Sequence, residues 1–211
     1  MELLLKYFPD ISEKQRGQFA QMQGLYSYWN AQINVISRKD MDGLMIHHVL
    51  HSLAIAKYIS FKPGTQLIDL GTGGGFPAIP LAIFFPEVEV IAVDSIAKKI
   101  KVTEAIADSL ELDNLRPLCA RVEELQFEPD FIVNRAVASL STLYHWTKNL
   151  ISHRHKNQFA NGLISLKGGD LRNEISEFGI LNRKSTLEQK PLSLYFEEDY
   201  FETKSLVYAS W

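Results

Sequence analysis

The sequence predicts an α/β fold: a Rossmann-like, mostly parallel seven-stranded sheet with a C-terminal antiparallel hairpin, preceded by an N-terminal helical extension. Three features support this prediction. Apolar residues recur at three- and four-residue steps in the first sixty residues, short apolar runs then alternate with helical segments, and the tail resembles two strands around an acidic turn. Strands that alternate with helices are typical of a parallel sheet covered on both faces.

The helical extension is expected over residues 1–60 and the Rossmann-like domain over 61–211. Within the extension, segments 13–36 and 37–59 each present an apolar face, and Pro63-Gly64 then ends the helical pattern. The apolar positions are Phe19, Met22, Leu25, Trp29, Ile33 and Ile36 in the first segment, and Leu44, Val49, Leu50, Leu53, Ile55 and Ala56 in the second.

The elements of the second part follow in order. Strands are expected over 65–70, 87–94, 115–120 and 130–137, within 161–170, and twice in the tail, 191–211. Helices are expected over 77–85, 95–112, 141–151 and 171–181. Ser95 is the expected N-cap of the second of these helices, and Ser141-Thr142 are expected to open the third.

Composition is ordinary for a globular protein, with 211 residues, 46% hydrophobic and 22% charged. No apolar run approaches the roughly 20 residues of a membrane span, and the start, MELLLKYFPD, does not resemble a signal peptide. The single cysteine, Cys119, allows no internal disulfide. We therefore expect a cytoplasmic monomer without membrane contact. Many nucleic-acid-binding proteins are strongly basic, whereas the formal net charge here is −3, so any nucleic-acid contact must come from a local basic patch. Binding to DNA is not expected.

The stretch IDLGTGGGFPAIPLA, residues 68–82, places Gly71, Gly73, Gly74 and Gly75 directly after the first predicted strand. Ligands bind open parallel sheets beyond the carboxyl ends of the strands, where strand order reverses. Glycines let the backbone approach such a ligand, and the following helix offers unpaired N–H groups. The stretch therefore predicts a nucleotide site.

Two glycine patterns compete at this turn. The dinucleotide fingerprint fails from Gly71, because Phe76 occupies its last position, and fits from Gly73 only with a turn far beyond the strand. The pattern Asp-x-Gly-x-Gly-x-Gly is met by Asp69, Gly71, Gly73 and Gly75. It resembles motif I of the class I S-adenosylmethionine-dependent methyltransferases.

The acidic residues help to choose between the two patterns. A carboxylate at Asp69 suits a sulfonium cation better than a pyrophosphate. Asp94 ends the second predicted strand, where in this class an acidic residue receives a ribose diol. The alternatives are that Asp69 only caps backbone amides and that Gly71 and Gly73 serve only the turn conformation.

Seven stretches together resemble the glucose-inhibited division protein B family of bacterial small-subunit ribosomal RNA guanine-N7 methyltransferases. They run in order over most of the chain, and GFPAIPLA and RAVA are the most specific parts. The stretches are 25–37, 47–56, 68–83, 93–100, 120–125, 134–140 and 163–169. The resemblance implies a class I fold and methyl transfer from S-adenosylmethionine to N7 of a guanine in 16S ribosomal RNA, with that RNA or the small ribosomal subunit as partner.

The resemblance also implies cofactor contacts from Gly71, Phe76, Val122-Glu123 and Arg135. The sequence departs from the family at two places. His51 stands where the family commonly has aspartate, and His47 stands where it often has arginine.

The chemistry constrains the remaining site residues. Guanine N7 has a free lone pair and no proton to lose, so no general base is needed and alignment of the reacting atoms supplies the catalysis. Because N7 must face the methyl donor, a basic residue can bind only O6 or phosphate. The candidate catalytic residues are Arg121, Arg135 and Lys167, at predicted strand ends. The alternatives are a salt bridge from Arg135 to Asp69 or Glu123, and a solvated charge at Lys167.

Aromatic, histidine and lysine side chains are further candidates for ligand contacts. Phe76 and Trp146 are candidates to stack on a base, although a core position is expected for Trp146. His47, His48 and His51 lack a carboxylate ligand at useful spacing, so no metal site is expected, and capping or RNA contact is expected instead. Lys98, Lys99 and Lys101 are expected on a solvated helix face, with phosphate contact as the alternative.

Two other functions remain open at this point. An NAD-dependent oxidoreductase requires a hydride-transfer partner that the sequence does not show. A non-enzymatic ribosome-assembly factor would bind ribosomal RNA without turnover.

Overall fold

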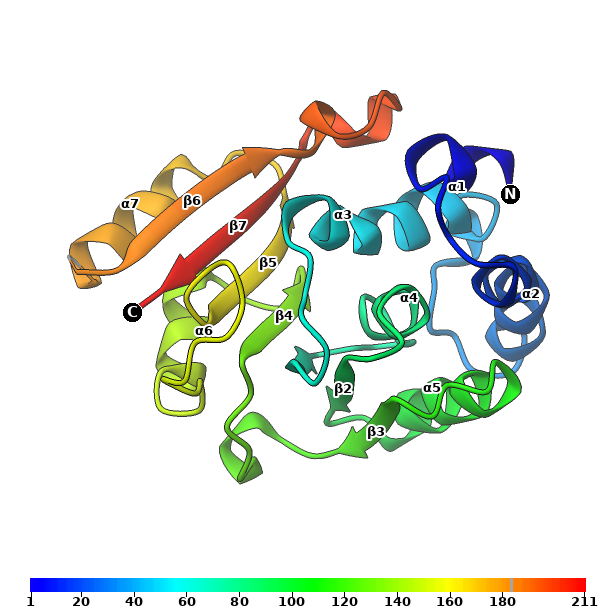
Figure 1. Ribbon diagram of the computed structural model, residues 1–211, viewed down its shortest axis with the longest axis horizontal. Helices are drawn as coiled ribbons and strands as arrows, with labels where there is room; N and C mark the ends of the chain where they lie inside the picture. The colour runs from blue at the N-terminus through cyan, green and yellow to red at the C-terminus, as the bar shows by residue number, and fades with distance from the viewer. Residues whose placement is uncertain (183) are drawn as a thin grey trace.

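The computed structural model describes residues 1–182 and 184–211, and its sheet has the strand order β3-β2-β1-β4-β5-β7-β6 (Figure 1). The strands are β1 Gln66–Leu70, β2 Glu89–Asp94, β3 Leu115–Cys119, β4 Phe131–Arg135, β5 Gly162–Gly168, β6 Thr186–Pro191 and β7 Lys204–Ser210. β1 to β5 are parallel, and β7 runs antiparallel to both β5 and β6. Strand order reverses between β1 and β4, which places the glycine turn at the reversal. The predicted seven-stranded sheet is confirmed.

Helices cover both faces of this sheet. Figure 1 shows α6 and α7 on one face and the N-terminal helices with α4 and α5 on the other. The α-helices are α1 Glu2–Tyr7, α2 Glu13–Asn30, α3 His51–Tyr58, α4 Ala78–Phe84, α5 Ala97–Ser109, α6 Leu140–Thr147 and α7 Arg172–Leu181. A π-helical segment, η2 Leu44–Leu50, runs directly into α3, and four short 3-10 turns are η1 Arg38–Asp40, η3 Val122–Glu124, η4 Leu192–Leu194 and η5 Asp199–Phe201. No described helix is long and apolar enough to cross a membrane.

The core consists of two hydrophobic clusters, one on each face of the sheet. Consecutive residues of β1 fall into different clusters: Leu67 packs with the N-terminal helices and α4, and Ile68 packs with α6 and α7. This alternation follows from the two-residue repeat of a strand, and burial on both faces explains why β1 is a continuous apolar run. It also directs Asp69, the next residue, toward α4.

Three local expectations were wrong. The first strand of the C-terminal hairpin is β6, which ends at Pro191 instead of lying within 191–211. The chain from 192 to 201 forms η4 and η5 instead, because Leu192, Phe196 and Phe201 turn inward and are buried. The two expected caps also differ, since Asp94 accepts from the N–H of Ile96 before α5, and Ser139 caps α6 by accepting from the N–H of Thr142.

Candidate active site

A cleft of about 460 Å³ opens beyond the carboxyl ends of the first four strands. Its walls are Leu70-Gly71 after β1, Val93–Ser95 at the end of β2, Ala120–Glu123 after β3, and Arg135–Val137 after β4. Lys99 of α5 and Trp146 of α6 complete the lining. A larger cleft, of about 570 Å³, lies near the opposite ends of the strands, where β2 begins, and it contains none of the predicted site residues. The smaller cleft is therefore the candidate site.

The glycine turn contributes Gly71 to the lining of this cleft. Gly71, Gly73 and Gly75 have φ angles of +74°, +59° and +97°, a backbone region that residues other than glycine seldom adopt. The N–H groups of Gly71 and Thr72 both donate to the carbonyl of Val93, at 2.8 and 2.9 Å, which ties the turn to the end of β2. A Cβ on Gly71 would lie 2.6 Å from Cγ2 of Val137, whereas one on Gly73 would meet open space. Gly71 lines the cleft and Gly73 does not.

Asp69 lies beneath the turn and outside the cleft lining. It is fully buried, and its Oδ2 accepts from the N–H of Ala78 at 3.0 Å, at the start of α4. Among the described residues, Oδ1 has no hydrogen-bond partner. Burial raises the pKa of Asp69 to about 7. The alternative stated for Asp69, that it only caps backbone amides, therefore describes the contact that its side chain makes.

Asp94 lines the cleft from the end of β2. Its Oδ2 accepts from the N–H of Gly73 at 3.0 Å, and its Oδ1 accepts from the N–H of Ile96 at 2.9 Å. The ammonium of Lys99 lies 3.8 Å from Oδ2. Each carboxylate oxygen retains acceptor capacity after these bonds, because it has two lone pairs. Asp94 can therefore hold the turn and still accept hydroxyl groups from a ligand.

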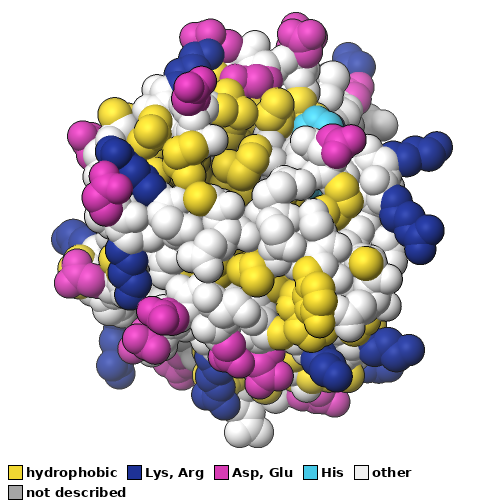
Figure 2. Space-filling view, turned by 90° about the vertical axis from the view of Figure 1, so that its right-hand side faces the viewer, with side chains coloured by type: hydrophobic (Ala, Val, Ile, Leu, Met, Phe, Trp, Pro, Cys, Tyr) yellow, Lys and Arg dark blue, Asp and Glu magenta, His cyan; other side chains and the backbone are white. Residues whose placement is uncertain are grey.

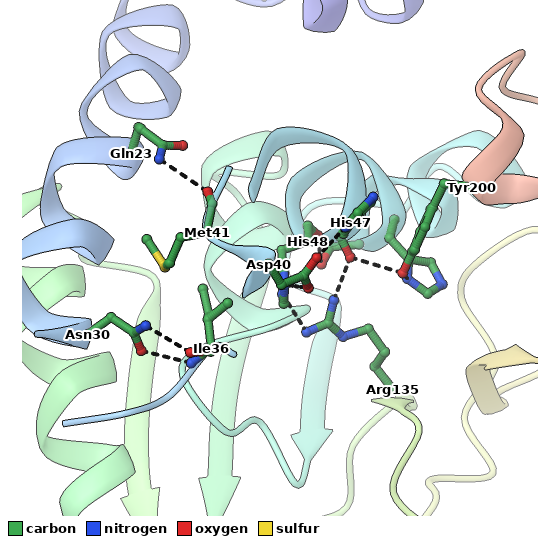
Figure 3. Close-up of polar contacts among 11 residues, drawn as sticks. Gln23, Asn30, Ile36, Asp40, Met41, His47, His48, Arg135 and Tyr200 are labelled. Carbon is green, nitrogen blue, oxygen red and sulfur yellow. Dashed lines mark hydrogen bonds and ion pairs between the residues drawn. The ribbon is translucent and has the colours of Figure 1, made fainter. Parts of the chain in front are cut away.

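Arg135 reaches the cleft from the end of β4, but its bonds go to the N-terminal extension (Figure 3). Nη1 donates to the carbonyl of His47 and Nη2 approaches Nδ1 of His48, both at 2.9 Å. The guanidinium also lies over the ring of Phe76, 5.3 Å from the ring centroid. The proposed salt bridge from Arg135 to Asp69 or Glu123 is not formed, and burial lowers the pKa of Arg135.

Phe76 and Trp146 occupy positions opposite to those expected. Phe76 is 3% exposed, packs between Tyr26 and His48, and does not line the cleft. Trp146 is 40% exposed and lines the cleft, so the expected core position is wrong. The reason is helix phase: α6 buries Leu140, Leu143 and Thr147, and Trp146 falls between these positions.

Of the remaining basic candidates, Arg121 lies at the cleft and Lys167 lies outside its lining. Arg121 is exposed at the cleft, next to Val122 and Glu123. Lys167 is only 7% exposed and lies outside the lining, with its ammonium 2.7 Å from the carbonyl of Ala138 and 2.6 Å from Oε1 of Glu174. A solvated charge at Lys167 is therefore wrong. Lys99 also departs from the expected solvated helix face, because it lines the cleft beside Asp94.

The three histidines bind different partners. Asp40 contacts Nδ1 of His47 with one oxygen and Nε2 of His48 with the other, the latter at 2.7 Å. His51 is 4% exposed, and its Nδ1 lies 3.2 Å from the hydroxyl of Tyr200. The expected capping or RNA-facing role does not describe His48 and His51, because both side chains are buried in the fold.

Asp40 and Val137 belong to this region but were not among the residues expected there. Val137 follows Arg135 at the end of a predicted strand, so the rule that ligands bind at such ends contained a usable signal. No local pattern marks Asp40, because its partners, His47 and His48, lie on the next helical segment, η2, seven and eight positions further along the chain.

Comparison with known proteins decides the family. The sequence model of the GidB family, described as rRNA small subunit methyltransferase G, matches residues 15–197. The chain belongs to this family. A ribosomal RNA small subunit methyltransferase G from Porphyromonas gingivalis is 55% identical over 208 residues, which are 98% of this chain and 92% of that protein. One from Bacteroides thetaiotaomicron is 52% identical over 209 residues, which are 99% of each chain.

Solved structures agree on the fold. A SAM dependent methyltransferase from Aquifex aeolicus superposes with a TM-score of 0.58 at 17% identity, covering 82% of this chain and 98% of that one. An rRNA methylase from Streptococcus thermophilus gives a TM-score of 0.52 at 14% identity, covering 79% and 98%. The expected class I methyltransferase fold is confirmed.

Membership in the GidB family also confirms the expected enzyme class and its methyl donor, S-adenosylmethionine. The family description names small-subunit ribosomal RNA as the molecule on which its members act. An oxidoreductase and a non-enzymatic assembly factor are therefore not retained.

Proposed function

We propose that this protein transfers a methyl group from S-adenosylmethionine to N7 of a guanine in the small-subunit ribosomal RNA. The observation that carries the proposal is the cleft at the strand-order reversal, where Gly71, Asp94, Val122-Glu123 and Arg135 meet. In this proposal the chain consists of an N-terminal helical extension, 1–60, and a methyltransferase domain, 61–211.

The residues of the cleft fit the chemical groups of the methyl donor. Asp94 offers carboxylate oxygens to a ribose diol, and Val122 offers an apolar wall to a purine ring. Arg135 is the half-buried cation suited to a carboxylate, and a charge-assisted bond of this kind is among the stronger polar contacts. Close approach over Gly71 requires the absence of a side chain there.

Trp146 is the aromatic platform of the site in this proposal. It is the exposed aromatic ring that lines the cleft, on the wall beside Val122. An indole provides a large flat apolar face for a stacked base. Phe76 acts indirectly, by supporting the guanidinium of Arg135 from below.

Catalysis by this chain consists of orientation and electrostatics. S-adenosylmethionine supplies, when bound, a methyl group activated by a sulfonium. N7 of guanine attacks with a lone pair and carries no proton, so no side chain has to remove one. The work of the protein is then to hold N7 in line with the methyl group, which can lower a barrier by several kcal/mol. Asp69 contributes by holding the glycine turn against α4.

The basic residues have different roles in this proposal. Arg121, exposed at the cleft, is the candidate for RNA phosphate or guanine O6. Lys167 instead supports the loop between β4 and α6, because both of its bonds lie within the fold.

The partner is ribosomal RNA or the small ribosomal subunit, bound by a cytoplasmic monomer that uses neither DNA nor membrane. Figure 2 shows one face of the molecule, on which Lys and Arg side chains stand mainly around the edge, interspersed with Asp and Glu. Such a face lacks the continuous positive field of proteins that bind DNA without sequence preference. Shape recognition of an exposed RNA base suits it better.

A labelling experiment tests the proposal. Small ribosomal subunits that lack N7-methylguanine are incubated with the protein and radiolabelled S-adenosylmethionine, and the RNA is then digested to nucleosides. We expect the label in N7-methylguanosine, a loss of transfer in Asp94→Ala, and normal transfer in Glu177→Ala, which changes an exposed residue of α7. Label in another nucleoside would refute the N7 assignment, and no transfer to the subunit would refute the acceptor.

A further inference from the structure

Arg135 is half-buried and forms no ion pair with a carboxylate of the described residues, and its orientation depends on another part of the chain. The residue ends β4, yet its guanidinium bonds run to η2 of the N-terminal extension, 87 and 88 positions away in sequence. A guanidinium that is partly withdrawn from water needs such partners, because loss of hydration is costly for a charged group. The conformation of η2 therefore decides where this cation lies in the cleft.

The bond between Arg135 and His48 requires one protonation state of the imidazole. A guanidinium only donates hydrogen bonds, so Nδ1 of His48, at 2.9 Å from Nη2, must be the acceptor and carry no proton. The ring proton must then be on Nε2. That nitrogen lies 2.7 Å from Oδ2 of Asp40, which accepts its proton in a hydrogen bond.

The surroundings favour this state from every side. His48 faces Asp40 of η1, its neighbour His47 on η2, and Arg135 of β4. Burial, followed by the nearby positive charge of Arg135, lowers the pKa of His48 to about 4. Burial opposes ionisation of Asp40, but hydrogen bonds from His47 and His48 outweigh it and lower the pKa of Asp40. Near neutral pH, Asp40 is therefore an ionised carboxylate, His48 is a neutral imidazole and Arg135 is a charged guanidinium.

Tyr200 closes the opposite side of the network (Figure 3). Its ring stacks on His47, with centroids 4.1 Å apart, and its hydroxyl lies 3.4 Å from the carbonyl of His47. The same carbonyl accepts from Arg135. The C-terminal segment thus steadies the second partner of the guanidinium, while Lys204, over the Tyr200 ring, adds a further positive charge nearby.

We propose that Asp40 and His48 are positioning residues for Arg135. Asp40 holds the imidazole of His48 in the tautomer that leaves Nδ1 free, and Nδ1 aims the guanidinium at the methyl-donor cleft. The inference rests on the proposed function of Arg135 as a cofactor contact. It gives the N-terminal extension a defined part in the active site.

A matched pair of substitutions separates the two bonds of His48. The amide oxygen of asparagine takes about the place of histidine Nδ1, and the amide nitrogen of glutamine takes about the place of Nε2. His48→Asn thus keeps an acceptor for Arg135, and His48→Gln keeps a donor for Asp40. We expect His48→Gln to bind S-adenosylmethionine about tenfold more weakly than wild type, and His48→Asn to stay within about threefold.

The measurement is equilibrium binding of radiolabelled S-adenosylmethionine to the full chain, with steady-state kinetics on small subunits alongside. Asp40→Asn is expected to raise KM for the donor about tenfold and to change KM for the subunit little. Arg135→Ala is the reference for complete loss, and His153→Asn, at an exposed position, is the control. Melting temperatures verify that each variant is folded.

The outcomes distinguish the inference from the proposed function. If Arg135→Ala binds the donor as wild type does, the proposed role of Arg135 fails. If Arg135→Ala loses binding while His48→Gln and Asp40→Asn keep it, only the positioning inference is overturned. Equal losses in His48→Asn and His48→Gln would also overturn it, since a general packing role predicts no difference between the two amides.

Discussion

Val137, in the loop after β4, lies directly over Gly71, so that a Cβ on Gly71 would approach its Cγ2 to 2.6 Å. This contact joins the glycine turn to the loop that follows Arg135. Ala136 in that loop has a φ of +52°, which places Val137 toward the turn. The two segments therefore form one wall of the cleft, although they are far apart in sequence.

Gly71→Ala is predicted to weaken donor binding about tenfold or more, because the added methyl displaces Val137 into the cleft. Gly64→Ala is a matched control, since Gly64 has a φ of +71° and open space at the same position. Both substitutions should cost about 1 kcal/mol of stability from the positive φ. Equal donor affinities in the two variants would show that the contact with Val137 does not matter for binding.

The raised pKa of Asp69 predicts that the free energy of unfolding depends on pH in a particular way. Its pKa of about 7 in the folded protein lies above the ordinary value of 3.8, so the folded state binds the proton more tightly than the unfolded state. The stabilisation from this proton is complete below about pH 4 and is lost as the pH rises to about 7. Asp69→Asn, which cannot ionise, should therefore gain stability relative to wild type between pH 5 and pH 8.

The check is the difference in melting temperature between Asp69→Asn and wild type, measured across that range. His48 and His51 also titrate differently in the folded state, but they are present in both proteins and cancel in the difference. A difference that stays constant with pH would contradict the raised pKa of Asp69.

Lys167→Ala is predicted to act mainly on stability. It removes the only ammonium near Oε1 of Glu174, at 2.6 Å, which then keeps the N–H of Leu140 as its donor among the described residues, and it removes the donor to the carbonyl of Ala138. Breaking a buried pair by removing one member costs about 3–5 kcal/mol, and less is expected here because the Glu174 side chain is 21% exposed. Denaturant unfolding measures the effect, and the double variant Lys167→Met with Glu174→Gln should recover part of it. Full stability in Lys167→Ala, with a raised KM for the subunit, would favour contact with RNA instead.

Trp146→Ala is predicted to weaken donor binding about tenfold, whereas Trp146→Phe should retain most of it. The side chain is 40% exposed, so neither change should lower the melting temperature by more than a few degrees. If Trp146→Ala instead raises only the KM for the small subunit, the ring stacks on the acceptor base and not on the donor.

Much of the architecture could be predicted from local patterns. The apolar run before Gly71 and the glycines themselves are sufficient to place β1 and the turn, because strand and turn preferences act between near neighbours. The first strand of the C-terminal hairpin could not be placed, since Leu192, Phe196 and Phe201, which follow it, turn into the core for reasons that periodicity does not reveal. The family was identified from motifs in the sequence, and the comparisons agree.

The sequence by itself determined the alternation of strands and helices, the positive-φ turn and the acidic end of β2, because each depends on a few consecutive residues. Only the tertiary structure decided that Asp69 caps α4, that Lys167 is paired with Glu174 and that Trp146 enters the cleft. It also decided that Asp40 and His48 hold Arg135. Such contacts join side chains from distant segments, and their partners are chosen by how the helices pack on the sheet, which no local pattern encodes.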